Sequence, residues 1–211
     1  MLDNANLVIL GSKVTLVPYE REHVAKYHQW MADPWLQGTF RRGTQTTASE
    51  PLSMEEEYAM QQTWRNDPKK CTFIVLERAV SDAVASWTDD AALARMAGDV
   101  NLFFNDDEDP HNCEIEIMIA ESKYRRCGFA REAVQLMMAY ASSELHVTRF
   151  YCKIHETNEA SLTLFKSLGY KECNYVKAFE EFELELHPKD NWEEVVDQVL
   201  SRCQLHRAQS S

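Results

Sequence analysis

The stretch CEIEIMIAESKYRRCGFAREAVQLMMAYA, residues 113–141, contains a predicted strand, a basic turn and a predicted helix in direct succession. Residues 113–120 combine apolar and β-branched residues in the alternation that is typical of a strand. From Gly128 onward the apolar residues, Met137 and Met138 among them, recur at helical spacing. This order predicts an α/β domain in which a strand leads through a tight turn into a helix whose methionines pack in the core.

The size and charge of the chain limit the classes of protein to which it can belong. Its 211 residues, 45% of them hydrophobic, suffice for one sizeable domain. With 34 acidic and 22 basic residues the net charge is −12, so nucleic acid is not an expected partner. The opening residues lack the basic start and long apolar run of a signal peptide, and no other run approaches membrane-spanning length. We therefore predict a single domain over residues 1–211 and no membrane partner.

Neither the cysteines nor the histidines show the spacing of a metal site. The six cysteines stand at wide intervals without a C-x-x-C pair, and the seven histidines form no H-E-x-x-H motif. Unpaired thiols are typical of a reducing compartment. The sequence therefore predicts no metal and a cytoplasmic location.

Further strands and helices are expected on either side of the central stretch. Strands are predicted at residues 13–19, 71–77, 98–104 and 149–155, with two more within 170–186. Helices are predicted at residues 21–33, 54–66 and 158–168, with an amphipathic helix packed on the domain within 188–206. Ser53 and Glu56 form a capping box before the second helix. Strand 13–19 should be half-buried, with Val14 and Leu16 facing the core.

The basic turn has the features of an anion site. A helix begins with free N–H groups and a partial positive charge, Gly128 permits close approach of an anion, and Ala130 keeps the next turn small. Four cations fall within nine positions: Lys123, Arg125, Arg126 and Arg131. In so acidic a chain this reversal of charge indicates an anionic ligand such as a diphosphate. A basic loop without a ligand fits the same residues.

Two motifs together resemble the GNAT superfamily of N-acetyltransferases. RRCGFA, residues 125–130, resembles the R/Q-x-x-G-x-G/A acetyl-CoA motif, and NEASLTLFKSLGY, residues 158–170, resembles its companion segment. Residues 14–34 are similar to the branch that acetylates ribosomal-protein α-amines. The resemblance covers about residues 10–185, which form the expected domain core. It implies a central mixed, mostly antiparallel sheet, flanked by helices and splayed between its fourth strand, at 113–120, and its fifth.

The resemblance also implies acetyl-CoA as cosubstrate and assigns residues to it. Its diphosphate would meet the basic turn, at Arg125, Arg126, Cys127, Gly128, Phe129, Ala130 and Arg131. Its pantetheine arm would bind backbone groups of Met118, Ile119 and Ala120, and the side chain of Asn158. Asn158 also fits an ordinary N-cap. The implied acceptor is a protein or peptide with a free N-terminus, and tubulin is one acceptor that the resemblance suggests.

Direct acetyl transfer needs a proton acceptor for the amine and a proton donor for the departing thiolate. Glu114 and Glu116 lie two apart and share one face of the strand with Met118. Glu116 lies deeper in the strand and is the preferred base, with a solvent-facing edge as the alternative. Many relatives carry a tyrosine on the helix after the fifth strand as general acid, but Phe165 stands here. Ser161 remains as a donor near the sulfur, or as an ordinary surface residue.

Functions of different classes fit these residues. The first is an N-acetyltransferase in which the neutral α-amine of a protein attacks the thioester directly. The second is an acyl-CoA-binding cytoskeletal adaptor with little catalysis, which the missing tyrosine leaves open. Polyamine acetylation, a third, fits the acidic composition. The segment 35–52, with Trp35, Phe40, Arg41 and Arg42, is expected to border the acceptor without identifying it.

Overall fold

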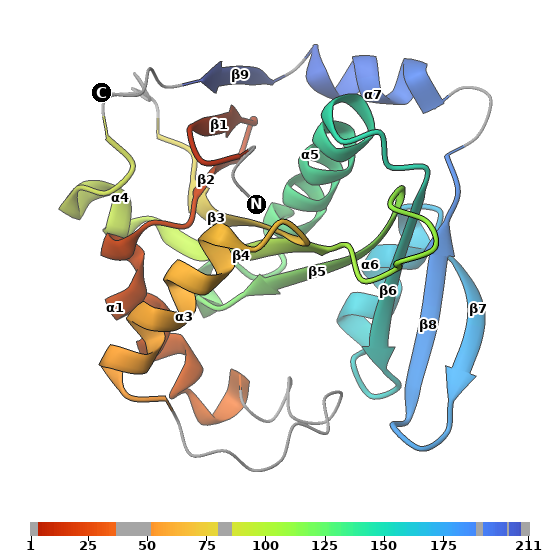
Figure 1. Cartoon of the computed structure of the whole chain (residues 1–211), viewed down its shortest axis with the longest axis horizontal. Coiled ribbons are helices and arrows are strands. Elements are labelled where there is room, and N and C mark those ends of the chain that lie inside the picture. Colours follow the sequence, from red (N-terminus) through yellow and green to blue (C-terminus); the bar gives the residue numbers. More distant parts are fainter. Residues whose placement is uncertain (1–3, 37–51, 80–85, 189–191, 202, 208–211) are drawn as a thin grey trace.

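The computed structural model describes residues 4–36, 52–79, 86–188, 192–201 and 203–207. Phe40, Arg41 and Arg42, which we expected beside the acceptor, lie outside these residues. The described residues form one nine-stranded sheet of order β7-β8-β6-β5-β4-β3-β2-β1-β9, flanked by helices (Figure 1). The strands are β1 (Leu7–Leu10), β2 (Val14–Pro18), β3 (Lys70–Glu77), β4 (Met96–Phe103), β5 (Asn112–Ile119), β6 (Arg149–His155), β7 (Lys171–Val176), β8 (Glu181–Leu186) and β9 (Gln204–Arg207). The α-helices are α1 (Val24–Met31), α3 (Met54–Asn66), α4 (Asp90–Ala94), α5 (Phe129–Glu144), α6 (Glu159–Ser167) and α7 (Trp192–Leu200).

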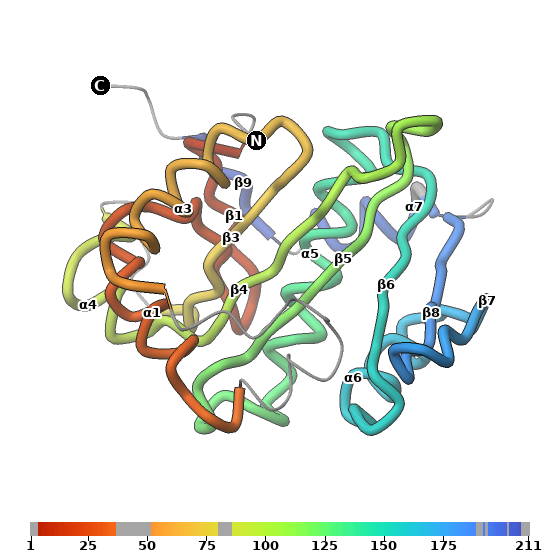
Figure 2. Tube along the Cα trace, turned by 60° about the horizontal axis from the view of Figure 1, so that its bottom comes forward, coloured from red at the N-terminus to blue at the C-terminus, as the bar shows by residue number. Residues whose placement is uncertain are grey.

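The sheet separates where two parallel strands meet. Every neighbouring pair is antiparallel except β5 and β6. Their pairing joins Asn112, Cys113 and Glu114 to residues 149–151 and then stops. Figure 2 shows the two strands diverging beyond this point. Because they run in the same direction, α5 and α6, which follow them, both begin at the open end of the gap. The predicted splay is confirmed.

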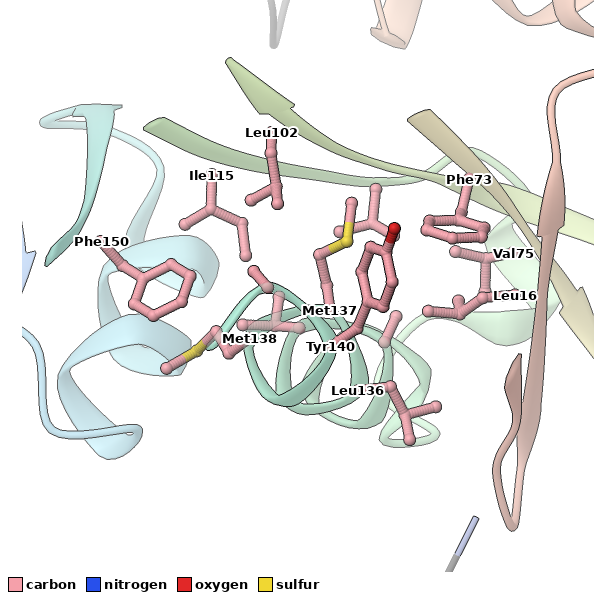
Figure 3. Packing of buried hydrophobic residues seen from close by; sticks show 14 of the residues in the cluster. Leu16, Phe73, Val75, Leu102, Ile115, Leu136, Met137, Met138, Tyr140 and Phe150 are labelled. Carbon is pink, nitrogen blue, oxygen red and sulfur yellow. The ribbon is translucent and has the colours of Figure 1, made fainter. Parts of the chain in front are cut away.

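One face of the sheet packs on α5. Apolar side chains of this helix, Met137 and Tyr140 among them, point toward the sheet, where Phe73 and Ile115 meet them (Figure 3). Met137 is fully buried and Met138 nearly so, which confirms their predicted core role. Tyr140 meets Phe73 edge to face, with ring centroids 5.7 Å apart. The strand, turn and helix of the opening stretch are thus fixed by one apolar layer.

Helices α1 and α3 cover the other face of the sheet at β2, β3 and β4 (Figure 1). The predicted capping box begins α3: Glu56 N–H donates to Ser53 Oγ, and Ser53 N–H donates to Glu56 Oε2 at 2.8 Å. The prediction of a half-buried strand 13–19 is wrong. All five residues of β2 are buried, because α5 covers one of its faces and α1 and α3 cover the other.

The C-terminal segment differs from the helix predicted within 188–206. Helix α7 ends at Leu200, and β9 then pairs with β1 at the edge of the sheet. Trp192 ties α7 to α5, because its Nε1–H donates to Ser142 Oγ at 2.9 Å. Strand β1 was also missed, although the apolar run Leu7–Leu10 is fully buried. Within the described part of the chain, no helix has the length and apolar character needed to cross a membrane.

Candidate active site

The basic turn enters α5 through left-handed backbone. Gly128 is the N-cap of α5 with φ 86°, and Arg126 also has a positive φ of 59°. The first N–H groups of α5 have no carbonyl partner within the helix, so they form a donor cradle at the open end of the gap. Lys13, which the sequence did not suggest, lies beside it: its Nζ donates to the Cys127 carbonyl at 2.9 Å. A further cation thus stands at the turn from a distant part of the chain.

Arg125 and Arg131 donate hydrogen bonds to other elements of the domain, whereas Lys123 Nζ lies 4.4 Å from the ring centroid of its neighbour Tyr124. Arg125 Nε donates to the Ile119 carbonyl at 3.0 Å, its Nη2 donates to the Ala120 carbonyl, and its guanidinium stacks 3.6 Å from the Trp35 ring centroid. Arg131 donates to Ser167 Oγ and so joins α5 to α6. Arg125 therefore braces the end of β5, and the charge that remains exposed at the turn comes from residues such as Arg126 and Lys123.

The ladder between β4 and β5 decides which backbone groups face the gap. Ala120 N–H donates to the Ala97 carbonyl at 2.8 Å, and Met118 is paired with Asp99 of β4. Because hydrogen-bonded pairs alternate in an antiparallel ladder, the N–H and C=O of Met118 also face β4. The backbone groups of Ile117 and Ile119 therefore face β6. Of the three residues predicted to hold the pantetheine, Ile119 is the one turned toward the gap, and Arg125 already engages its carbonyl.

Both predicted carboxylates lie on the face of the sheet opposite α5. We call this side of β5, β6 and β8 the acceptor face. Glu114 is buried, and its Oε2 accepts from Lys153 Nζ at 2.8 Å. Glu116 has no hydrogen bond or ion pair with the described residues, and its side chain reaches solvent. Desolvation by the surrounding protein, followed by the charges of Glu114 and Asp99, raises the pKa of Glu116 to about 7. A carboxylate in this state can accept a proton near neutral pH.

A buried polar row under α1 and α3 continues from Glu116 across the sheet. Thr72 Oγ1 donates to Asn101 Oδ1 at 2.7 Å, and Asn101 Nδ2 donates to Asp99 Oδ2 at 2.6 Å. Asn101 is the β4 partner of Glu116. Burial raises the pKa of Asp99 to about 6. Periodicity could not reveal this row, because Thr72 lies on β3 and its partners Asn101 and Asp99 lie on β4.

Lys70 closes the row on β3. Its Nζ lies 2.8 Å from the Trp64 ring centroid and 4.6 Å from that of Phe103. Burial lowers the pKa of Lys70 to about 8, against the opposing effect of the Asp99 and Glu116 charges. The lysine is therefore a cation held among aromatic rings on the same face as Glu116.

Helix α6 begins with the residues of the companion segment. Asn158 is its N-cap, and its Oδ1 accepts from Ser161 N–H at 3.2 Å. The Ser161 hydroxyl has no hydrogen bond with the described residues. Phe165 is buried on the α5 side and meets Tyr170 edge to face at 5.0 Å. Tyr170 itself donates to Met138 Sδ, so neither aromatic ring offers a free hydroxyl.

The fold and this gap are those of an acetyl-CoA-dependent acyltransferase. Residues 13–171 match the acetyltransferase (GNAT) domain family, and the chain belongs to that family of N-acetyltransferases. Among the described residues, no group of three or more histidine, cysteine, aspartate or glutamate side chains could hold a metal ion.

The chain is also similar in sequence to named proteins of several animals. The chain is 44% identical over 184 residues to "Alpha/beta-tubulin-N-acetyltransferase 9" of Homo sapiens, covering 87% of this chain and 84% of that protein. It is 45% identical over 199 residues to the protein of the same name from Drosophila melanogaster, covering 92% and 94%. It is also 45% identical over 183 residues to an "N-acetyltransferase 9-like protein" of Nematostella vectensis, covering 86% of each chain.

Solved structures share the fold at low identity. Spermidine N-acetyltransferase from Vibrio cholerae, in complex with CoA and spermine, aligns with a TM-score of 0.65 at 18% identity, covering 83% of this chain and 96% of that one. The ribosomal L7/L12 alpha-N-protein acetyltransferase in complex with coenzyme A aligns with a TM-score of 0.65 at 13% identity, covering 84% and 96%. Both likenesses concern the fold alone.

Proposed function

We propose that this enzyme transfers the acetyl group to the α-amine of a protein N-terminus, with tubulin as an acceptor. The observation that carries the proposal is the free carboxylate of Glu116 on the acceptor face, whose pKa of about 7 suits proton acceptance from an α-amine. At pH 7.4 about a quarter of α-amines are already neutral, against about a thousandth of lysine side chains. A single weak base is therefore sufficient to remove the proton from an α-amine. The names of the tubulin-directed relatives favour this acceptor.

In this proposal Glu116 takes the proton of the attacking amine, directly or through one water, while Glu114 holds Lys153. The thioester supplies an activated acetyl group, so no covalent enzyme intermediate is needed. The Ser161 hydroxyl, which no described residue engages, is the donor for the departing thiolate. Phe165 cannot take this role, and a hydroxyl added there would enter the packed cluster around Tyr170.

The cosubstrate is assigned to the gap between β5 and β6. Its diphosphate would meet the N–H groups at the start of α5, where Gly128 and Arg126 provide the left-handed turn and Lys13 adds charge. Its pantetheine arm would run along the backbone groups that β5 turns toward β6. Asn158 Nδ2 remains available to that arm, since its Oδ1 caps α6.

We assign the protein to the cytosol and treat residues 1–211 as one domain. All six cysteines are free thiols, and Cys127 and Cys173 are exposed, which suits a reducing compartment. The contact of α7 with α5 and the addition of β9 to β1 support one cooperative unit.

The experiment incubates the protein with acetyl-CoA and a library of N-terminal peptides, and reads acetylation by mass. Each peptide is paired with a version blocked at its α-amine that carries a free lysine, and spermidine serves as a third acceptor. We expect acetylation of free α-amines first. Faster acetylation of blocked peptides or of spermidine would contradict the proposal. Binding of CoA without acceptor-dependent release of its thiol would instead favour the adaptor.

A further inference from the structure

The acceptor face carries more carboxylates than those assigned to catalysis. Three of them already have partners: Glu114 accepts from Lys153 at 2.8 Å, Glu183 from Asn174 Nδ2 at 2.9 Å, and Glu185 from Arg149 Nε at 2.9 Å. The cations Lys153 and Arg149 compensate the charges of Glu114 and Glu185, and the neutral Asn174 amide gives Glu183 a hydrogen bond.

Glu181 on the same face is different. It is only 7% exposed, yet it makes no hydrogen bond or ion pair with any described residue. Its β6 neighbour His155 is already engaged, with Nδ1 at 2.9 Å from Thr157 Oγ1 and Nε2 at 3.4 Å from Glu180. Burial raises the pKa of Glu181, and Lys153 opposes that effect. The Glu181 oxygens are not among the fully buried atoms that lack a partner, so they keep contact with solvent and a cation supplied from outside can reach them. Partial removal from water strengthens the attraction between the two charges.

The position of Glu181 fits an acceptor that reaches Glu116. Glu181 pairs with His155, at the end of β6 that has separated from β5, and therefore lies beside the open end of the gap. Two strand spacings place Glu181 at least about 10 Å from Glu116. An extended peptide advances about 3.4 Å per residue. With its α-amine at Glu116, a peptide would bring the side chain of its second or third residue toward Glu181.

We propose that Glu181 forms a subsite for a cationic group of the acceptor, namely a lysine or arginine side chain at the second or third position of the N-terminal peptide. This inference rests on the proposed α-amine function and names its substrate class. The bound cation gives Glu181 an ionic partner, whereas a neutral side chain leaves it without one. A second amine of a polyamine has the same chemistry and is a separate arm of the test.

The test compares two peptides that differ in one charge, with arginine or its neutral isostere citrulline at the second position. We expect the wild-type protein to acetylate the arginine peptide with at least tenfold higher kcat/KM, chiefly through a lower KM. Glu181→Gln should remove most of this preference and leave the citrulline peptide unchanged. Glu183→Gln is the matched control: it lies on the same strand and face, but its carboxylate is already bonded, and it should keep the preference.

The outcomes of this test separate a failure of the subsite from a failure of the proposed function. Equal rates for the two peptides, a preference that survives Glu181→Gln, or an equal loss for both peptides would overturn the subsite and leave the α-amine function intact. Acetylation of neither peptide by a protein that still binds CoA, or faster turnover of spermidine than of both, would overturn the proposed function together with the subsite. Glu181→Gln should also melt no lower than wild type at pH 7.5, because a neutral amide replaces a partly desolvated carboxylate that has no ionic partner.

Discussion

Replacing Glu116 with glutamine removes the proposed base and keeps the shape of the side chain. With a pKa of about 7, Glu116 is about nine-tenths ionised at pH 8 and about one-tenth ionised at pH 6. General-base catalysis typically contributes about 10² to 10⁴-fold, and an α-amine near half neutral at pH 8 needs less. We therefore expect Glu116→Gln to lower kcat/KM by about tenfold to a thousandfold at pH 8, with acetyl-CoA affinity nearly unchanged.

The pH dependence of this loss identifies the group. The acceptor amine titrates equally in both reactions, so the ratio of wild-type to variant kcat/KM depends on Glu116 alone. That ratio should fall about tenfold from pH 8 to pH 6, with a midpoint near 7. Glu114→Gln is the matched control, since Glu114 is already paired with Lys153. It should retain most activity and lower the midpoint, because the Glu114 charge raises the pKa of Glu116.

The pH dependence of stability provides an independent check. Ionisation of Glu116 raises activity as the pH rises, but it lowers the stability of the folded protein. The pKa of Glu116 is raised from 4.5 to about 7, so the folded protein binds more protons than the unfolded chain within this window. Stability from this group is present below pH 4.5 and is lost as the pH rises to 7. Glu116→Gln escapes that loss and should melt slightly higher than wild type at pH 8, with no difference near pH 4.5; the gain is small because the side chain is exposed and water screens its charge. A rate ratio independent of pH, or equal losses in Glu116→Gln and Glu114→Gln, would refute the assignment.

Changes at four further positions test the surroundings of the site. Asp99→Asn should lower, and Lys70→Met should raise, the pH midpoint of kcat/KM, because their charges shift the pKa of Glu116 in opposite directions; shifts of the same sign would contradict this. Gly128→Asp should bind CoA at least tenfold more weakly than Gly128→Asn by calorimetry. Both variants strain the left-handed turn and place a Cβ 2.9 Å from Lys13 Nζ, but asparagine and aspartate are enriched at such turns among non-glycine residues and differ from each other in charge. Equal affinities would remove the anion site from this turn. Glu132→Ala should lower the free energy of unfolding in urea by about 2 to 4 kcal/mol, because its carboxylate accepts from three backbone N–H groups and one hydroxyl between β1 and β2; an unchanged free energy would contradict that anchoring role.

The elements that the sequence predicted correctly are those fixed by local chemistry. The capping box at Ser53 set the start of α3, and β6 at Arg149–His155 matches the prediction in full. Burial of β2 on both faces depends on helices far away in the chain, so a pattern within β2 could not reveal it. The same holds for β9, whose exposed residues form a strand only because β1 offers a free edge.

The residues of the candidate site also differ in whether local sequence could predict their roles. Gly128 could be predicted because a glycine before a helix leaves a signature in sequence. The role of Arg125 could not, since its partners are the carbonyls of Ile119 and Ala120 and the ring of Trp35. Glu181 stands in a run of alternating glutamates, and only the pairing of its neighbours distinguishes it. The partners of such residues become visible only once the strands are paired, because the spacing of residues along the sequence does not contain them.

The two faces of the sheet differ in composition: the face on α5 is apolar, and the face under α1 and α3 carries buried polar groups. Several buried polar atoms have no protein hydrogen-bond partner among the described residues, and Tyr19 Oη, Glu57 Oε2 and Asp99 Oδ1 are three of them. All three belong to the layer under α1 and α3, and the Asp99 charge acts on Glu116. Each such atom costs stability, since burial removes water without a replacement. The apolar layer on α5 offsets that cost with residues such as Phe73 and Met137. Polar groups can therefore stay underpaired in this layer. One of them, Asp99, acts with desolvation and the Glu114 charge to raise the pKa of Glu116 to about 7, near the pH at which an α-amine begins to lose its proton.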